Sequence, residues 1–248
     1  MDTRFEQLRR TWDQFGERDP LWAILSDPKK RRNRWELESF LDTGRREIDE
    51  VLAAVGCSFP NVPRTCALDF GCGVGRLSRA LSAHFDRVIG IDVATSMIRR
   101  AQELNTDRRN CEFKLNERGD LGIIASGSVD FVYSNLVLQH IERPYSDCYI
   151  REFVRVLSPR GLAVFQELDR PGRSVAGLLT RLIPGPVAEF YRSARFGRER
   201  IRMHAIPAEQ IHLIVQGAGG RVVRQEPLDS ADDRWKSNLY FVRRSGAD

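Results

Sequence analysis

The sequence predicts an α/β fold built on a mostly parallel sheet. Between residues 65 and 168, short apolar runs typical of strands alternate with segments of helical periodicity, as βαβ units require. One of these runs ends in a glycine-rich turn that leads into a helical pattern, "ALDFGCGVGRLSRAL" at 67–81. The 248 residues are 42% hydrophobic, enough for one substantial core. We therefore expect one main domain with additions rather than two equal domains.

The first 60 residues are predicted to form a helical extension. They carry three of the four tryptophans, Trp12, Trp22 and Trp35, and two Asp-Pro pairs divide them into short pieces. Apolar side chains recur at helical spacing in "RWELESFLDTGRREIDEVLAAVG" (34–56), which Gly44 and Gly56 punctuate. We expect residues 1–60 to act as a lid or cap on a domain spanning 61–248.

Strands and helices then follow in order. The predicted strands are 65–70, 87–92, 111–115, 129–134 and 161–168, and the predicted helices between them are 75–85, 95–104 and 145–157. The alternation stops after residue 168. Residues 169–206, rich in Arg, Pro and Gly around a short apolar helix at 174–183, are interpreted as a substrate-lid insertion. A helix at 207–218 and strands at 220–227 and 237–244 complete the pattern.

Composition narrows the function classes. The net charge of +5 is mild, so it permits anionic partners without requiring them. No apolar run reaches the ~18–20 residues of a membrane span, and the first residues lack the apolar centre of a signal peptide. The five cysteines include no C-x-x-C pair. We therefore expect a cytoplasmic protein with no membrane association, no structural disulfide and no metal site.

The glycine-rich turn indicates an adenosine-type cofactor, and neighbouring residues discriminate among such cofactors. A dinucleotide site needs a third glycine where this chain has Arg76. Asp69, at the end of the strand, would repel a pyrophosphate at the helix N-terminus. S-adenosyl-L-methionine (SAM) has no phosphate and carries an ammonium group, which a carboxylate can pair with. These residues favour SAM over NAD or FAD.

Polar residues that end the next two predicted strands support this interpretation. Asp92 lies 21 residues after Gly71, where a carboxylate can accept hydrogen bonds from both ribose hydroxyls. Asn116 and Glu117 end the third strand, where the adenine amino edge would lie. The alternative is that these side chains are helix caps or solvated strand ends.

Four stretches of the chain, "LDFGCGVGRL", "VIGIDVATSMIRRA", "VDFVYSNLVLQHI" and "YIREFVRVLSPRGLAVFQE", resemble the motifs of the class I SAM-dependent methyltransferases. They cover residues 65–168 in the family's order, and they are most similar to its small-molecule, methyltransferase-11-like branch. The resemblance implies a Rossmann-like sheet of seven mostly parallel strands with helices on both faces and the last strand, 237–244, antiparallel. Arg160 departs from the family's usual Pro-Gly-Gly, which bears on a turn.

The resemblance also implies a cofactor site, with Met97 packed against the adenine. The predicted cofactor-binding residues are Trp12, Asp69, Gly71, Cys72, Gly73, Asp92, Val93, Met97, Asn116, Glu117, Asn135 and Leu136. The tryptophans near the N-terminus have two interpretations: they anchor helices on the core, or their segment folds over the methionine end of the cofactor, with an aromatic face near the sulfonium.

His140 is the predicted catalytic residue, because histidine titrates near neutrality and the loop after the fourth strand should adjoin the methionine half of the cofactor. The alternative is that His140 only packs or hydrogen-bonds within its loop. His204 is a second candidate base. His84 and His212 lie in helical patterns and are interpreted as surface or packing residues.

These observations predict SAM-dependent methyl transfer to a small-molecule acceptor, with O-methylation as the first expectation. Basic runs at 29–34 and 192–202 raise the alternative of an RNA methyltransferase, but "SNLV" stands where an Asn-Pro-Pro-Tyr-type motif would lie, and nucleic acid is not the expected partner. A non-catalytic SAM-binding protein is a further alternative. A short-chain NAD-dependent dehydrogenase would need a Tyr-x-x-x-Lys pair, which is absent from the sequence.

Overall fold

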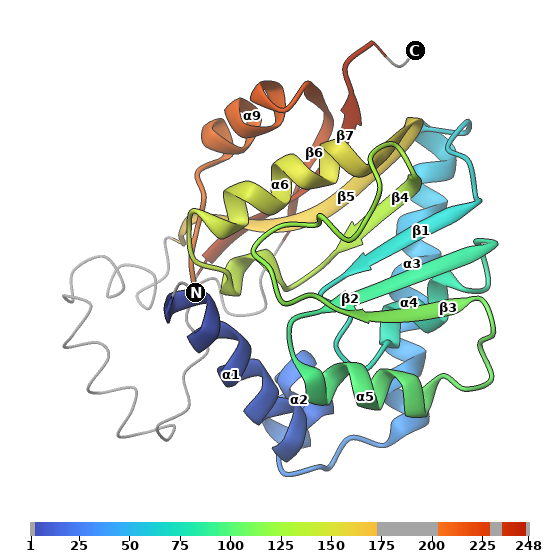
Figure 1. Cartoon of the computed structure of the whole chain (residues 1–248), viewed down its shortest axis with the longest axis vertical. Helices are drawn as coiled ribbons and strands as arrows, with labels where there is room; N and C mark the ends of the chain where they lie inside the picture. The colour runs from blue at the N-terminus through green and yellow to red at the C-terminus, as the bar shows by residue number, and fades with distance from the viewer. Residues whose placement is uncertain (1–2, 173–202, 229–234, 247–248) are drawn as a thin grey trace.

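A computed structural model describes residues 3–172, 203–228 and 235–246 (Figure 1). Its centre is a seven-stranded sheet with the strand order β3-β2-β1-β4-β5-β7-β6. The strands are β1 Cys66–Phe70, β2 Arg87–Asp92, β3 Cys111–Leu115, β4 Val129–Ser134, β5 Leu157–Pro171, β6 Gly220–Leu228 and β7 Trp235–Arg244. Strands β1 to β5 pair in parallel, and β7 is antiparallel to both β5 and β6. The predicted Rossmann-like sheet with an antiparallel last strand is confirmed.

The helices also follow the prediction. They are α1 Thr3–Arg18, α2 Pro20–Ile24, α3 Leu37–Ser58, α4 Arg76–Leu81, α5 Thr95–Leu104, α6 Tyr145–Val156 and α9 Ala208–Gly217, with short 3₁₀ turns η1 Pro28–Lys30 and η2 Leu138–His140. Helix α4 is shorter than predicted, because the backbone N–H groups of Ala83 and His84 bond three residues back and tighten its end. Helix α3 runs without interruption through both of its internal glycines.

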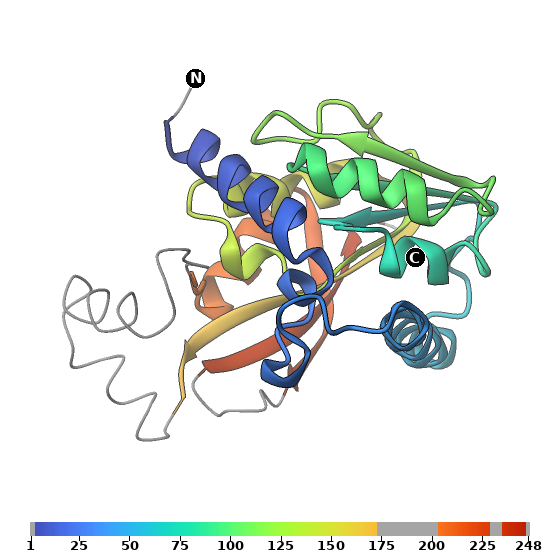
Figure 2. The same ribbon diagram turned by 90° about the horizontal axis from the view of Figure 1, so that it is seen from below.

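The core lies on both faces of the sheet (Figures 1 and 2). Phe153 of α6 and Ile211 of α9 belong to the cluster on one face, together with Leu68 of β1. Ile48 of α3 and Leu81 of α4 belong to the cluster on the other face. Because successive side chains of a strand point to opposite faces, strands covered on both sides are apolar throughout, as the burial of all five β1 residues shows.

The N-terminal helices α1 and α2 lie beside α5, next to the carboxyl ends of the strands (Figure 2). Ser96 joins α5 to α1, since its backbone N–H donates to Asp13 Oδ1 (2.7 Å) and its hydroxyl donates to the Asp13 carbonyl (2.8 Å). Arg100 donates to the Gly16 carbonyl at 2.8 Å. The helical extension is thus hydrogen-bonded to the sheet domain.

Part of the predicted lid insertion lies outside the described residues. Strand β5 extends the fifth predicted strand to Pro171, and residues 203–207 lead into α9. The predicted helix at 174–183 and the basic run at 192–202 fall in the part that is not described. Within the described ranges, no helix is long and apolar enough to cross a membrane.

The two glycines inside α3 allow a matched test of how closely this helix packs on α4. A Cβ at position 44 would lie 2.8 Å from the Arg76 backbone oxygen, whereas one at position 56 would meet nothing within 4 Å. We expect Gly44→Ala to lower the free energy of unfolding. Gly56→Ala should raise it by about 0.5–1 kcal/mol, because alanine has the higher helix propensity. Urea unfolding of both variants checks this, and equal effects would contradict the close packing.

Candidate functional site

The loop between β1 and α4 is the centre of the candidate site. Gly71, Gly73 and Gly75 all have positive φ angles, +74°, +53° and +82°. The loop is anchored to β2, because the backbone N–H groups of Gly71 and Cys72 both donate to the Ile91 carbonyl at 2.8 and 3.0 Å. A Cβ on Gly71 would lie 2.4 Å from the Val137 side chain. The turn therefore requires glycine both for its conformation and for the close approach of the loop after β4.

Asp92, the last residue of β2, holds this loop through its side chain. Its Oδ2 accepts from the Gly73 backbone N–H and its Oδ1 from that of Ala94, both at 2.9 Å. Burial raises the pKa of the carboxyl, and these two hydrogen bonds oppose that shift. A carboxylate offers about four acceptor sites, so two remain for a ligand. Asp92 is consequently both a structural acceptor and a candidate ribose ligand.

A cavity of about 400 Å³ opens at the carboxyl ends of the strands, where ligands of open parallel sheets bind. Its lining comes from the glycine loop, the ends of β1, β2 and β3, the loop after β4, and the helices α1 and α2. The lining residues are Leu8, Trp12, Ala23, Ile24, Ser26, Phe70, Gly71, Cys72, Gly73, Arg76, Leu77, Ile91, Asp92, Val93, Met97, Asn116, Asn135, Leu136, Val137, Gln139, His140, Ile141 and Met203.

Most of the residues expected from the sequence meet in this cavity. His140 and ten of the twelve predicted cofactor-binding residues line it. The two others lie outside the lining. Glu117 is largely exposed and forms an ion pair with Arg9 at 2.7 Å. Asp69 is buried at the end of β1.

Asp69 faces the interior between β1 and α4. Its Oδ2 accepts from the Ser78 hydroxyl at 2.6 Å, and its Oδ1 has no hydrogen-bond partner among the described residues. Burial raises the pKa of this carboxyl to about 7, against the lowering effects of the Ser78 hydrogen bond and of Arg76. The side chain therefore gains or loses a proton near neutral pH.

Arg76 is a lining residue that the sequence argument used only to exclude a dinucleotide. Its guanidinium is 3% exposed and pairs with Glu47 of α3 at 2.9 Å, while its Nε has no partner among the described residues. Glu47 also accepts from the Tyr133 hydroxyl (3.0 Å) and from Asn135 Nδ2 (2.8 Å). A buried arginine next to an invariably small turn residue could have signalled a site. Its partner Glu47, 29 residues earlier, could not have been inferred.

The three N-terminal tryptophans divide between the two interpretations. Trp22 and Trp35 donate their indole N–H groups to backbone carbonyls of Asp27 and Leu25, so both anchor the extension. Trp12 lines the cavity and packs against the His140 ring at a centroid distance of 5.3 Å.

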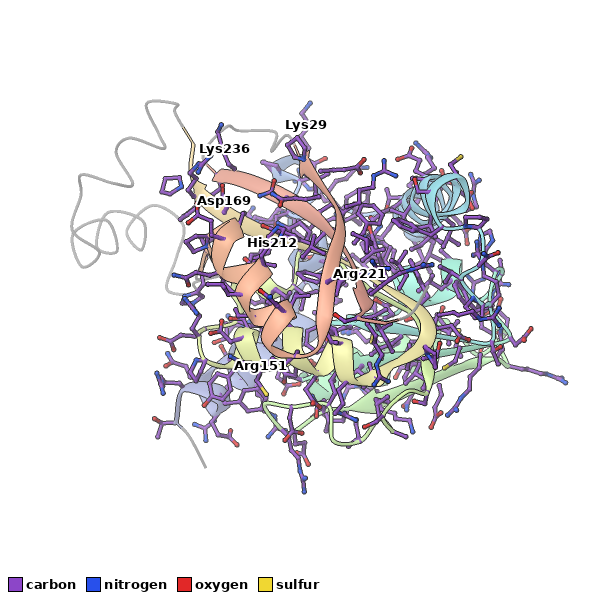
Figure 3. All side chains as sticks on the ribbon, turned by 90° about the horizontal axis from the view of Figure 1, so that it is seen from above. Lys29, Arg151, Asp169, His212, Arg221 and Lys236 are labelled. Carbon is purple, nitrogen blue, oxygen red and sulfur yellow. The ribbon has the colours of Figure 1, made fainter. Side chains whose placement is uncertain are left out.

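The other histidines lie outside the lining. His84 pairs with Asp49 near the surface, and His212 of α9 contacts Gln225 of β6 (Figure 3). The backbone N–H of His204 donates to the Gln139 carbonyl at 2.7 Å. Of the four histidines, His140 is the one in the cavity lining.

Thiol and metal chemistry find little support in the described part of the chain. All five cysteines are free, and burial raises the pKa of the Cys72 thiol in the cavity well above its usual range. Cys72 is therefore a neutral thiol at physiological pH, a poor nucleophile. No group of three or more potential metal ligands occurs among the described residues.

The titration of Asp69 generates a pH prediction. Its carboxyl has an ordinary pKa of 3.8 when unfolded and about 7 when folded. As the pH rises from about 4 to about 7, the unfolded chain loses this proton while the native protein retains it, so stability falls. Asp69→Asn cannot titrate, and we expect its free energy of unfolding relative to the wild type to rise across this window.

Chemical denaturation at a series of pH values measures the effect. Asp107→Asn is the control, because an ion pair with Arg79 lowers the pKa of this exposed carboxyl and places its titration below the window. Parallel stability profiles for Asp69→Asn and the wild type between pH 4 and 8 would show that Asp69 does not titrate there.

Comparisons with known proteins agree with this geometry. Residues 68–165 match a family model described as "Methyltransferase domain". A malonyl-[acyl-carrier protein] O-methyltransferase from Methylovorus sp. is 35% identical over 111 residues, covering 41% of this chain and 36% of the relative. A ubiquinone biosynthesis O-methyltransferase from Xanthomonas campestris is 26% identical over 162 residues, covering 65% of this chain and 57% of the relative. The chain thus spans only part of these relatives.

Solved structures share the fold over nearly the whole chain. Magnesium protoporphyrin IX methyltransferase from Synechocystis, with bound SAH (S-adenosylhomocysteine), has a TM-score of 0.64 and 19% identity over 97% of this chain and 99% of its own. The matched segment contains the glycine loop, Asp92 and the loop after β4. The chain therefore belongs to the class I SAM-dependent methyltransferase family, whose cofactor is S-adenosyl-L-methionine.

Proposed function

We propose that this protein transfers the methyl group of SAM to a small-molecule acceptor, with a hydroxyl as the first candidate for the accepting group. The observation that carries the proposal is the cavity in which the glycine loop, Asp92 and the loop after β4 face one another beneath Trp12. SAM supplies an activated methyl group when bound. What remains for the chain is to bind, orient and exclude water.

The residues around the cavity suit the adenosine half of this cofactor. Asp92 retains acceptor capacity for two ribose hydroxyls. Met97 and Val93 offer apolar surface for a base. Asn116 is buried, and its side-chain N–H group is used by the Asp120 carbonyl at 2.8 Å. We propose that these four residues bind adenosine.

Arg76 suits the methionine half. A buried guanidinium with an unpartnered Nε is an electropositive group in the wall of the cavity, and only Glu47 offsets its charge among the printed contacts. A methionine carboxylate would satisfy it. We propose Arg76 as the carboxylate-binding residue, with Asn135, Leu136, Cys72 and the loop glycines lining the same half.

The acceptor is proposed to be a metabolite with an apolar body. Leu136, Val137, Ile141 and Met203 line the cavity near His140, and Leu136 and Met203 are among the exposed large apolar residues of the chain. Relatives are named for acting on quinone-type molecules, phosphoethanolamine and malonyl-[acyl-carrier protein], which supports a small acceptor group in general. We propose that His140 contacts this acceptor.

Cofactor binding is tested first, by calorimetry with SAH, NAD and FAD. We expect SAH to bind and the two dinucleotides to give no heat. In Asp92→Asn the charged acceptor is lost, and with charge-assisted hydrogen bonds worth about 1.5–3 kcal/mol each, SAH affinity should fall at least tenfold.

Asp107→Asn is the control for loss of a carboxylate away from the cavity, and it should bind SAH as the wild type does. The amide at position 92 keeps one oxygen for the backbone, and thermal unfolding without ligand checks that this variant is folded. Binding of NAD without binding of SAH would contradict the proposed function.

The acceptor class is tested by turnover. With SAM present, we expect SAH to accumulate with a panel of small apolar metabolites that carry hydroxyl groups, and not with total RNA. A matched panel of amines distinguishes oxygen from nitrogen acceptors. Turnover on RNA alone, with binding that weakens steeply as salt increases, would contradict the small-molecule proposal.

A further inference from the structure

Behind His140 lies a chain of hydrogen bonds that runs through two buried glutamines. The Leu136 backbone N–H donates to Gln166 Oε1 at 3.1 Å, and Gln166 Nε2 donates to Gln139 Oε1 at 3.2 Å. Gln139 Nε2 then lies 3.1 Å from His140 Nε2. Gln139 and Gln166 are 6% and 3% exposed, so water does not substitute freely for these partners.

The direction of this chain follows from its first member. A backbone N–H can only donate, so the side chain of Gln166 must present its oxygen to Leu136 and its nitrogen to Gln139. Gln139 must then present its oxygen to Gln166 and its nitrogen to His140. Turning either amide over would bring two donors face to face at a buried position, which costs about 1–3 kcal/mol. Ser237 Oγ accepts the second N–H of Gln166 at 2.8 Å, which fits the same orientation.

We infer that Gln139 and Gln166 are positioning residues that hold the neutral His140 ring with its proton on Nδ1 and its Nε2 lone pair on the Gln139 amide. In this state His140 is a hydrogen-bond donor and not a proton acceptor at Nε2. Its contribution to methyl transfer is therefore to orient a bound group rather than to take a proton from it. The importance of this state for catalysis rests on the proposed function, but the state itself does not.

The surroundings hold both ends of the chain in place. Leu136 has a φ of +61°, a left-handed conformation that costs a non-glycine residue of order 1 kcal/mol, and its N–H is the group bound by Gln166. At the other end, the Trp12 ring packs on the His140 ring. Turning that ring over would place a carbon atom opposite the Gln139 N–H. The backbone strain at Leu136 and the tautomer of His140 are thus coupled through two amides.

The test is direct observation of the ring nitrogens by NMR. Long-range ¹H–¹⁵N spectra of the full chain, without cofactor, are recorded at about pH 8.5, two units above the ordinary histidine pKa. The chain has four histidines, and His140→Gln identifies the signals of His140. We expect a protonated Nδ1 and an unprotonated Nε2. A protonated Nε2, which free histidine favours, would overturn the inference.

Two variants test the direction of the chain. Gln139→Glu has no N–H to give, so the proton of His140 should move to Nε2 and the spectral pattern should invert. Gln166→Leu removes the group that orients Gln139 without touching His140, and we expect both tautomers to appear. An unchanged His140 pattern in both variants would overturn the inference even if the wild type shows a protonated Nδ1.

Gln225→Glu is the matched control. Gln225 Oε1 lies 3.0 Å from His212 Nε2 on α9 (Figure 3), far along the chain from His140. This variant should move the His212 signals and leave those of His140 in place.

The spectra also separate this inference from the proposed function. A protein that shows a protonated Nδ1 but binds no SAH would refute the proposed function and support the inference. One that binds SAH with a protonated Nε2 at His140 would do the reverse.

Discussion

The close approach of the glycine loop to its neighbours is the constraint on which the rest of this structure depends. Two loop N–H groups converge on the Ile91 carbonyl, and a third is bound by Asp92. Where Gly71 and Gly73 have no side chains, Val137 and Ile24 pack against the loop. Strands β1, β2 and β4 can therefore end at one edge with their loops in contact, and the cavity is the space that remains between them.

The helices before β1 complete this cavity. Leu8, Trp12 and Ile24 form a wall that the sheet domain could not supply from its own residues. The contacts of Ser96 with Asp13 hold α1 in position, and the Glu47–Arg76 pair joins α3 to the loop. An ion pair with one member 3% exposed carries a large desolvation cost, which further hydrogen bonds from Tyr133 and Asn135 to Glu47 offset. The extension thus belongs to the site rather than to a separate unit.

Buried ionisable groups behave differently at the two ends of the central strands. Glu167 on β5 is fully buried, with its pKa raised to about 8 by burial, and one of its oxygens has no partner among the described residues. Asp69 on β1 has a similar environment. Asp130, near the start of β4, instead accepts from two backbone N–H groups and the Ser158 hydroxyl and ties three segments together. Uncompensated carboxyls are therefore found toward the cavity edge of the sheet, and compensated ones at the opposite edge.

The alternation of strands and helices, the glycine loop and the residues at strand ends were readable from the sequence, because each depends on local periodicity or on a turn that only glycine can make. Asp92, Asn116 and Met97 could be assigned to one site because parallel strands bring their carboxyl ends to one edge. The pairing of Glu47 with Arg76, the burial of Asp69 away from the cavity and the orientation of Gln139 by Gln166 depend on contacts between distant segments, for which no local pattern exists. Only the tertiary structure decided them, since the direction of a hydrogen-bond chain is set by its first backbone donor, and that donor becomes a neighbour of Gln166 only when β4 and β5 pair.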